Sequence, residues 1–80
     1  MSPPDEQIAS LNQIIKMVDD QATHYKNERF TMRPAQAQAQ KKLITDLIHN
    51  GLDIAERMSP KPLDVIQDLK KLEKQLSQMN

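Results

Sequence analysis

Apolar residues recur along this chain at alternating steps of three and four, the spacing that collects side chains on one face of an α-helix. The first such series covers residues 8 to 25, and the last covers residues 65 to 79. A third series with the same spacing lies between them, over residues 44 to 58. Polar and charged residues fill most of the positions in between. The pattern predicts three amphipathic helices.

A hydroxyl residue followed within three positions by proline stands before each predicted helix, at Ser2, Thr31 and Ser59. Such a side chain accepts hydrogen bonds from the free N–H groups of a first turn, where proline is also tolerated. We expect these residues to cap the helices, and Phe30 to pack on Ala35 as a hydrophobic staple. The predicted elements are a helix over 3–26, a connector over 27–32, and helices over 33–58 and 60–79, in one domain over 1–80.

The pair Asn50-Gly51 makes the course of the second helix ambiguous. Glycine after asparagine is typical of a helix C-terminus, yet the apolar stripe keeps its phase across Gly51. One continuous helix is favoured, with a kink or break at 50–51 as the alternative. An interior glycine costs about 1 kcal/mol relative to alanine, which is tolerable where a neighbouring helix approaches closely.

Short connectors between three amphipathic helices favour an all-α fold, a small antiparallel up-down-up three-helix bundle. Its core must be aliphatic, because Tyr25 and Phe30 are the aromatic residues of the 80 and there is no tryptophan. A chain of this length buries a modest fraction of its surface, and a second copy is a common way to complete such a core. Self-association is therefore an alternative to a monomer.

The composition narrows the class of protein. With no cysteine, disulfides and thiolate metal sites are excluded. The apolar runs are short and the N-terminal region is acidic, so we expect neither a membrane span nor a signal peptide, and predict a cytoplasmic protein. A formal net charge of +0 gives the whole chain no long-range attraction to nucleic acid or anionic lipid.

The histidines are the residues most able to carry chemistry. His24 follows Asp20 by four positions, and His49 lies between Asp46 and Asp53 at one-turn spacing. This spacing suits a metal ligand or a pH switch, but two ligands per turn without a third His or Cys are more typical of exposed ion pairs. No nucleophile stands beside a base. We predict no enzyme, no metal, no cofactor and no small-molecule substrate.

The tract Ala35-Gln36-Ala37-Gln38-Ala39-Gln40 gives the second helix little apolar surface with which to cover the first. Part of the first helix is then predicted to lack an intrachain cover, and to bind a protein partner or a second copy, at Ile14, Ile15 and Val18. The leading hypothesis is a non-catalytic helical module for protein–protein interaction or regulation.

A basic zone over residues 26–42 supports an alternative function. It holds five cations against one acid, Glu28. Such a cluster could contact phosphates, so a small nucleic-acid-binding regulator is the second hypothesis, less favoured because the whole chain is neutral. The residues concerned are Lys26, Arg29, Arg33, Lys41 and Lys42.

Two neighbouring stretches suggest a third function. The sequence resembles the middle of the pediocin-type bacteriocin immunity proteins from Leu43-Ile44-Thr45-Asp46-Leu47-Ile48, through Ala55-Glu56-Arg57-Met58-Ser59-Pro60-Lys61-Pro62-Leu63-Asp64-Val65-Ile66, to Leu69. Those are small cytosolic helical bundles in which an amphipathic helix, a polar turn and a further helix follow in this order. The resemblance implies protection of a producer cell through a membrane receptor complex, with no chemistry of its own.

Overall fold

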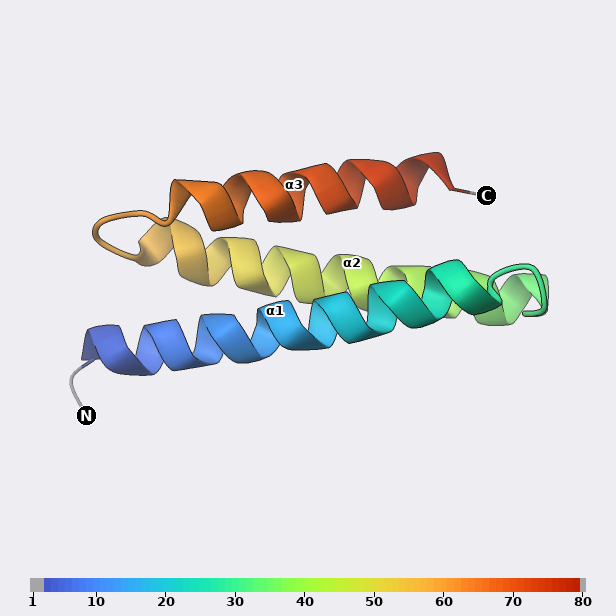
Figure 1. The fold of residues 1–80 in the computed structure, drawn as a ribbon, viewed down its shortest axis with the longest axis horizontal. Helices are drawn as coiled ribbons and strands as arrows, with labels where there is room; N and C mark the ends of the chain where they lie inside the picture. Colours follow the sequence, from blue (N-terminus) through green and yellow to red (C-terminus); the bar gives the residue numbers. More distant parts are fainter. Residues whose placement is uncertain (1–2, 80) are drawn as a thin grey trace.

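Three helices pack side by side in the computed structural model, which describes the backbone of residues 3–79 and the side chains of residues 5–79. They are α1 (Pro3–Glu28), α2 (Pro34–Arg57) and α3 (Leu63–Gln78). Their directions alternate along the chain, with α2 antiparallel to both of the others (Figure 1). The predicted all-α antiparallel three-helix arrangement is confirmed.

The predicted hydroxyl caps of the second and third helices are wrong. The residue that caps α2 is Arg33, with no side-chain hydrogen bond to the first turn. Thr31 instead donates its hydroxyl to the carbonyl of Glu28 at 2.8 Å, so it closes the end of α1. Proline keeps the residue before it out of the helical region, which places the start of α2 at Pro34 itself. Ser2 lies outside the described residues.

The third helix begins at Leu63, not at residue 60, and Pro62 occupies its N-cap position without a side-chain hydrogen bond. Pro62 keeps Lys61 extended, so no helix can pass through that residue. The first helix ends two residues later than predicted, at Glu28. The second ends at Arg57, one residue early.

The predicted staple of Phe30 on Ala35 is also wrong. Phe30 is 81% exposed, and the Arg29 guanidinium lies over its ring at 4.5 Å from the centroid. Met32 takes the inward position at this turn, half-buried against the core. Arg29 thus shields part of the phenyl ring from water, a favourable cation–π contact.

The core is aliphatic apart from one tyrosine and follows the predicted apolar stripes. Every helix contributes. Helix α2, which lies between the other two (Figure 1), supplies Ile44, Ile48 and Ala55 at 0% exposure, and α3 supplies Leu76 at 0%. The buried apolar residues are Leu11, Val18, Ala22, Tyr25, Ile44, Ile48, Ala55, Ile66, Leu69 and Leu76.

Helix α2 runs through Asn50 and Gly51 without a break, which confirms the continuous helix. Gly51 is buried where side chains from both neighbouring helices meet α2. A Cβ atom at this position would lie 3.2 Å from Ile14 Cγ2 of α1 and 3.2 Å from Leu69 Cδ1 of α3. The close approach explains why a helix interior tolerates glycine here.

Candidate interaction groove

Helix α2 holds α1 and α3 apart along one side of the molecule. Within the described residues, no Cα atom of α1 comes within 8 Å of one in α3, whereas both helices pack closely on α2. The gap between the side chains of α1 and α3 forms a groove of about 480 Å³. Its apolar lining is Ile15 and Val18 from α1 and Leu69 and Leu72 from α3.

The three residues predicted to bind a partner have three different environments. Ile15 is half-buried and forms part of the groove wall. Val18 also borders the groove, but it is only 2% exposed and belongs to the core. Ile14 points towards Gly51 on α2. Of the three, only Ile15 offers substantial apolar surface to the groove.

The expectation that the Ala–Gln tract would leave α1 uncovered is therefore wrong for Val18. Alanine side chains are small enough for the two helices to approach closely, and the tract makes a polar link of its own. The amide of Gln40 donates a hydrogen bond to Gln21 Oε1 on α1. The open side of α1 lies towards α3.

Charged residues of both signs border the groove. Lys16 and Asp19 stand on the α1 side, one helical turn apart, and Asp68 stands on the α3 side. Lys16 and Asp19 are exposed. A partner helix with a complementary order of charges could pair with this rim while its apolar face entered the groove.

Sequence reasoning missed the α3 wall of the groove, formed by Asp68, Leu69 and Leu72. The apolar stripe of α3 is as regular as that of α1 and gives no sign that part of it borders an open groove. Which stripe stays open depends on which helix occupies the middle of the bundle. That is a property of the tertiary arrangement.

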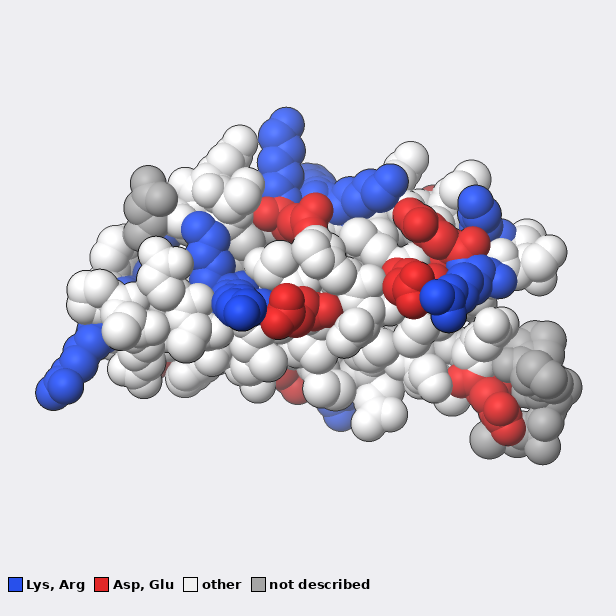
Figure 2. All heavy atoms as spheres, turned by 180° about the vertical axis from the view of Figure 1, so that it is seen from behind, with Lys and Arg blue, Asp and Glu red and all other residues white. Residues whose placement is uncertain are grey.

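The five cations of the basic zone differ in their exposure to solvent. Lys26, Arg33 and Lys42 are exposed, whereas Arg29 and Lys41 are half-buried and line a smaller pocket at one end of the bundle. On the face seen in Figure 2, basic and acidic side chains are mixed. The nucleic-acid hypothesis stays a prediction.

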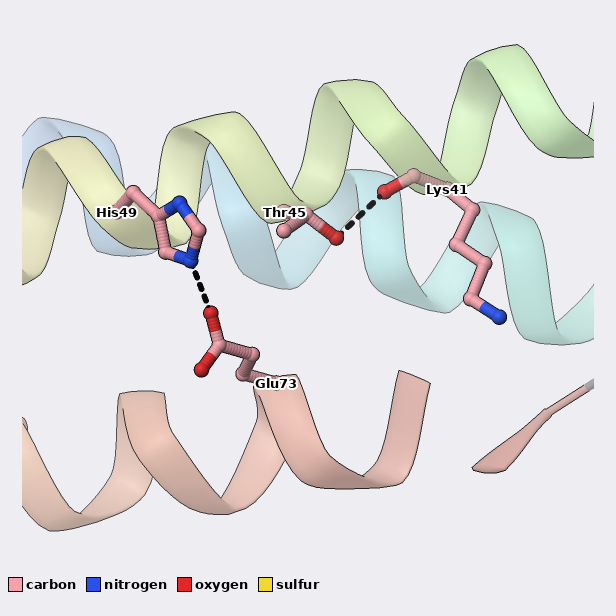
Figure 3. A network of polar contacts seen from close by, with 4 residues as sticks. All are labelled: Lys41, Thr45, His49 and Glu73. Carbon is pink, nitrogen blue, oxygen red and sulfur yellow. Dashed lines mark hydrogen bonds and ion pairs between the residues drawn. The ribbon is translucent and has the colours of Figure 1, made fainter. Parts of the chain in front are cut away.

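His49 pairs differently from the sequence expectation, which placed it beside Asp46 and Asp53. His49 contacts Glu73 on α3 through Nε2, as Figure 3 shows, and so links α2 to α3. On the same side of α2, Thr45 donates its hydroxyl to the Lys41 carbonyl at 2.9 Å. Asp53 pairs instead with Arg57, at 3.3 Å. Among residues 5–79, no three metal-ligating side chains converge on one point.

None of the helices in the described part of the chain is long and apolar enough to cross a bilayer. Comparison with protein-family models, with curated proteins and with solved structures finds no match. The resemblance to the bacteriocin immunity proteins thus stays a prediction, and the function is best argued from the groove.

Proposed function

We propose that this protein is a non-catalytic, self-associating helical module, in which the α1–α3 face of one copy pairs with the same face of a second. The observation that carries the proposal is the large surface left by the open arrangement. The chain exposes 5769 Å², whereas a compact monomer of 9.2 kDa exposes about 4,900 Å². The excess over the whole chain, about 800 Å², is of the size that one partner contributes to an interface of standard size.

The shape of the chain supports the same conclusion. Its radius of gyration is 13.7 Å, against about 12 Å for a compact domain of this length. The molecule is long and flat, with extents of 44 × 22 × 16 Å. Two such flat bodies placed face to face would bury their open grooves and form a thicker, more compact particle.

The charges beside the groove are self-complementary. If two α1 helices pair antiparallel about a two-fold axis near residues 17 and 18, Lys16 of each copy faces Asp19 of the other. Two ion pairs then form by symmetry near the axis. The Ile15 side chains of the two copies lie on either side of these pairs, and each enters the opposite groove.

Sedimentation equilibrium over a range of protein concentrations tests the proposal. We expect a dimer with a dissociation constant on the order of 1 μM. Ile15→Ser should shift the chain to the monomer while the far-UV circular dichroism stays helical. Val18→Asp is unsuitable because Val18 belongs to the core. A chain that stays monomeric at every concentration would overturn the proposal.

A charge exchange makes the test specific for this geometry. Lys16→Glu should weaken the dimer by at least about tenfold. The new acid of each copy would face Asp19 of the other, so the dimer would contain two repulsive pairs of acids. Adding Asp19→Lys to that variant should restore the dimer. Lys42→Glu makes the same change of charge on an exposed residue of α2 outside the groove, and should leave the dimer unchanged. Equal weakening by Lys16→Glu and Lys42→Glu would contradict the antiparallel pairing.

A further inference from the structure

A second pocket lies at the end of the bundle where the chain turns from α1 into α2 and where α3 ends. Its volume is about 270 Å³, larger than the ~150 Å³ of a cavity that holds benzene. Among the described residues, the side chains that line it are neutral or cationic. They include Tyr25, Arg29, Met32, Gln38, Lys41 and Met79, none of which borders the α1–α3 groove.

The hydroxyl of Tyr25 is the first sign that this pocket takes a ligand. Tyr25 is only 2% exposed, and its hydroxyl has no hydrogen-bond partner among the described residues. Within residues 5–79, no fully enclosed side-chain oxygen or nitrogen lacks a partner. The hydroxyl therefore keeps a small exposed area, and Tyr25 is one of the residues that line the pocket. Buried phenol groups usually find a partner, so this one is available to a bound molecule.

Two half-buried cations share the pocket with that hydroxyl. Lys41 donates one hydrogen bond from Nζ to the Met79 carbonyl at 2.8 Å, which leaves two of its three donors free. The Arg29 guanidinium lies over the Phe30 ring and donates no hydrogen bond to another described residue, so its N–H groups can still donate to a ligand. Together the three side chains offer donors of the kind that bind a carboxylate.

The start of α2 adds to the positive potential. Pro34, its first residue, lines the same pocket, and the first turn of α2 contains no acidic residue. Its N-cap residue makes no side-chain hydrogen bond. The positive end of this helix dipole is therefore not offset by a side chain of its own helix.

We propose that the pocket binds a small organic carboxylate. The carboxylate accepts hydrogen bonds from Arg29, Lys41 and the Tyr25 hydroxyl, and a short apolar group packs against Met32 and Met79. This assignment gives two cations of the basic zone a role that does not involve nucleic acid. It is independent of self-association, because the two sites share no residue.

An NMR titration of the ¹⁵N-labelled protein tests the site, with hexanoate as the probe. We expect saturable shifts centred on the amides of Tyr25, Gln38 and Met79, with a dissociation constant on the order of 1 mM. Hexan-1-ol lacks the charge and inorganic phosphate lacks the apolar group, so each should bind at least about tenfold more weakly. Absence of saturable shifts, or equal binding of either control, would overturn the proposal.

Substitutions locate the binding groups. Tyr25→Phe removes one oxygen and should weaken hexanoate binding about tenfold, without lowering the stability of the free protein, since the hydroxyl has no partner to lose. Lys41→Gln should weaken binding by a similar factor. Lys42→Gln removes the same charge from the neighbouring exposed residue, which does not line the pocket, and should leave binding unchanged. Equal losses from the two lysine variants would show attraction by bulk charge and overturn the assignment.

Discussion

Ile44→Ala is expected to lower the free energy of unfolding by about 3 kcal/mol. Ile44 is 0% exposed and lies on α2, where the core receives side chains from both neighbouring helices. The substitution removes buried apolar surface and leaves a cavity that rigid neighbours fill only in part. Because a chain of this length has a total stability of about 4 to 12 kcal/mol, the loss should be visible as a large shift of the urea midpoint, followed by circular dichroism.

The adjacent residue provides a matched control. Leu43 is also a large aliphatic residue in the same turn of α2, but it is 46% exposed. Leu43→Ala should cost less than about 1 kcal/mol, since little apolar surface returns to water. Both variants should be measured at one protein concentration, because the dimerisation that we propose would make the apparent stability depend on it. If the two substitutions lower the free energy of unfolding equally, then Ile44 does not lie on the buried face of α2 with Leu43 on its exposed face.

The phase of each helix could be predicted from sequence because it is a local property. On α2 the predicted stripe contained Ile44, Ile48, Gly51 and Ala55, and these are the four buried residues of that helix. A three-four spacing specifies one face whatever lies opposite to it. The same reasoning located most core positions of α1 and α3. The exceptions are Ile8, which is 46% exposed, and Val65, which is half-buried while its neighbour Ile66 is buried.

The helix starts were harder to predict because two local signals compete there. Thr31 and Ser59 have the chemistry of caps, but the proline rule controls the backbone immediately before Pro34 and Pro62. Proline fixes where the helix can begin, and the hydroxyl must then find another partner. Thr31 finds one in the preceding helix, at the carbonyl of Glu28.

The two candidate sites could be predicted only in part, because both depend on how helices meet. Ile15, Arg29 and Lys41 were identified as candidates from the sequence, yet the groove also needs Leu72 and the pocket also needs Tyr25 and Met79. Each of these additional residues belongs to an apolar stripe and resembles a core residue in sequence. Their exposure to a cavity follows from the separation of α1 and α3.

Gly51→Leu is expected to destabilise the fold by about 3 kcal/mol or more. A Cβ atom alone would already lie 3.2 Å from methyl groups of Ile14 and Leu69, so the remaining atoms of leucine must displace α1, α3 or both. The expected result is a lower urea midpoint. The dimer that we propose should also weaken, because the groove walls move with the two helices.

Two further variants separate this crowding from helix propensity. Asn50→Leu introduces the same side chain at the neighbouring exposed position and should be neutral or slightly stabilising, since leucine is the better helix former. Gly51→Ala gains about 1 kcal/mol of helix propensity but forces Ile14 and Leu69 to yield slightly, so its stability should stay within about 1 kcal/mol of the parent. A Gly51→Leu variant as stable as Asn50→Leu would mean that α1 and α3 do not converge on this glycine. The groove, which exists because both helices are held by α2 at that point, would then have a different shape.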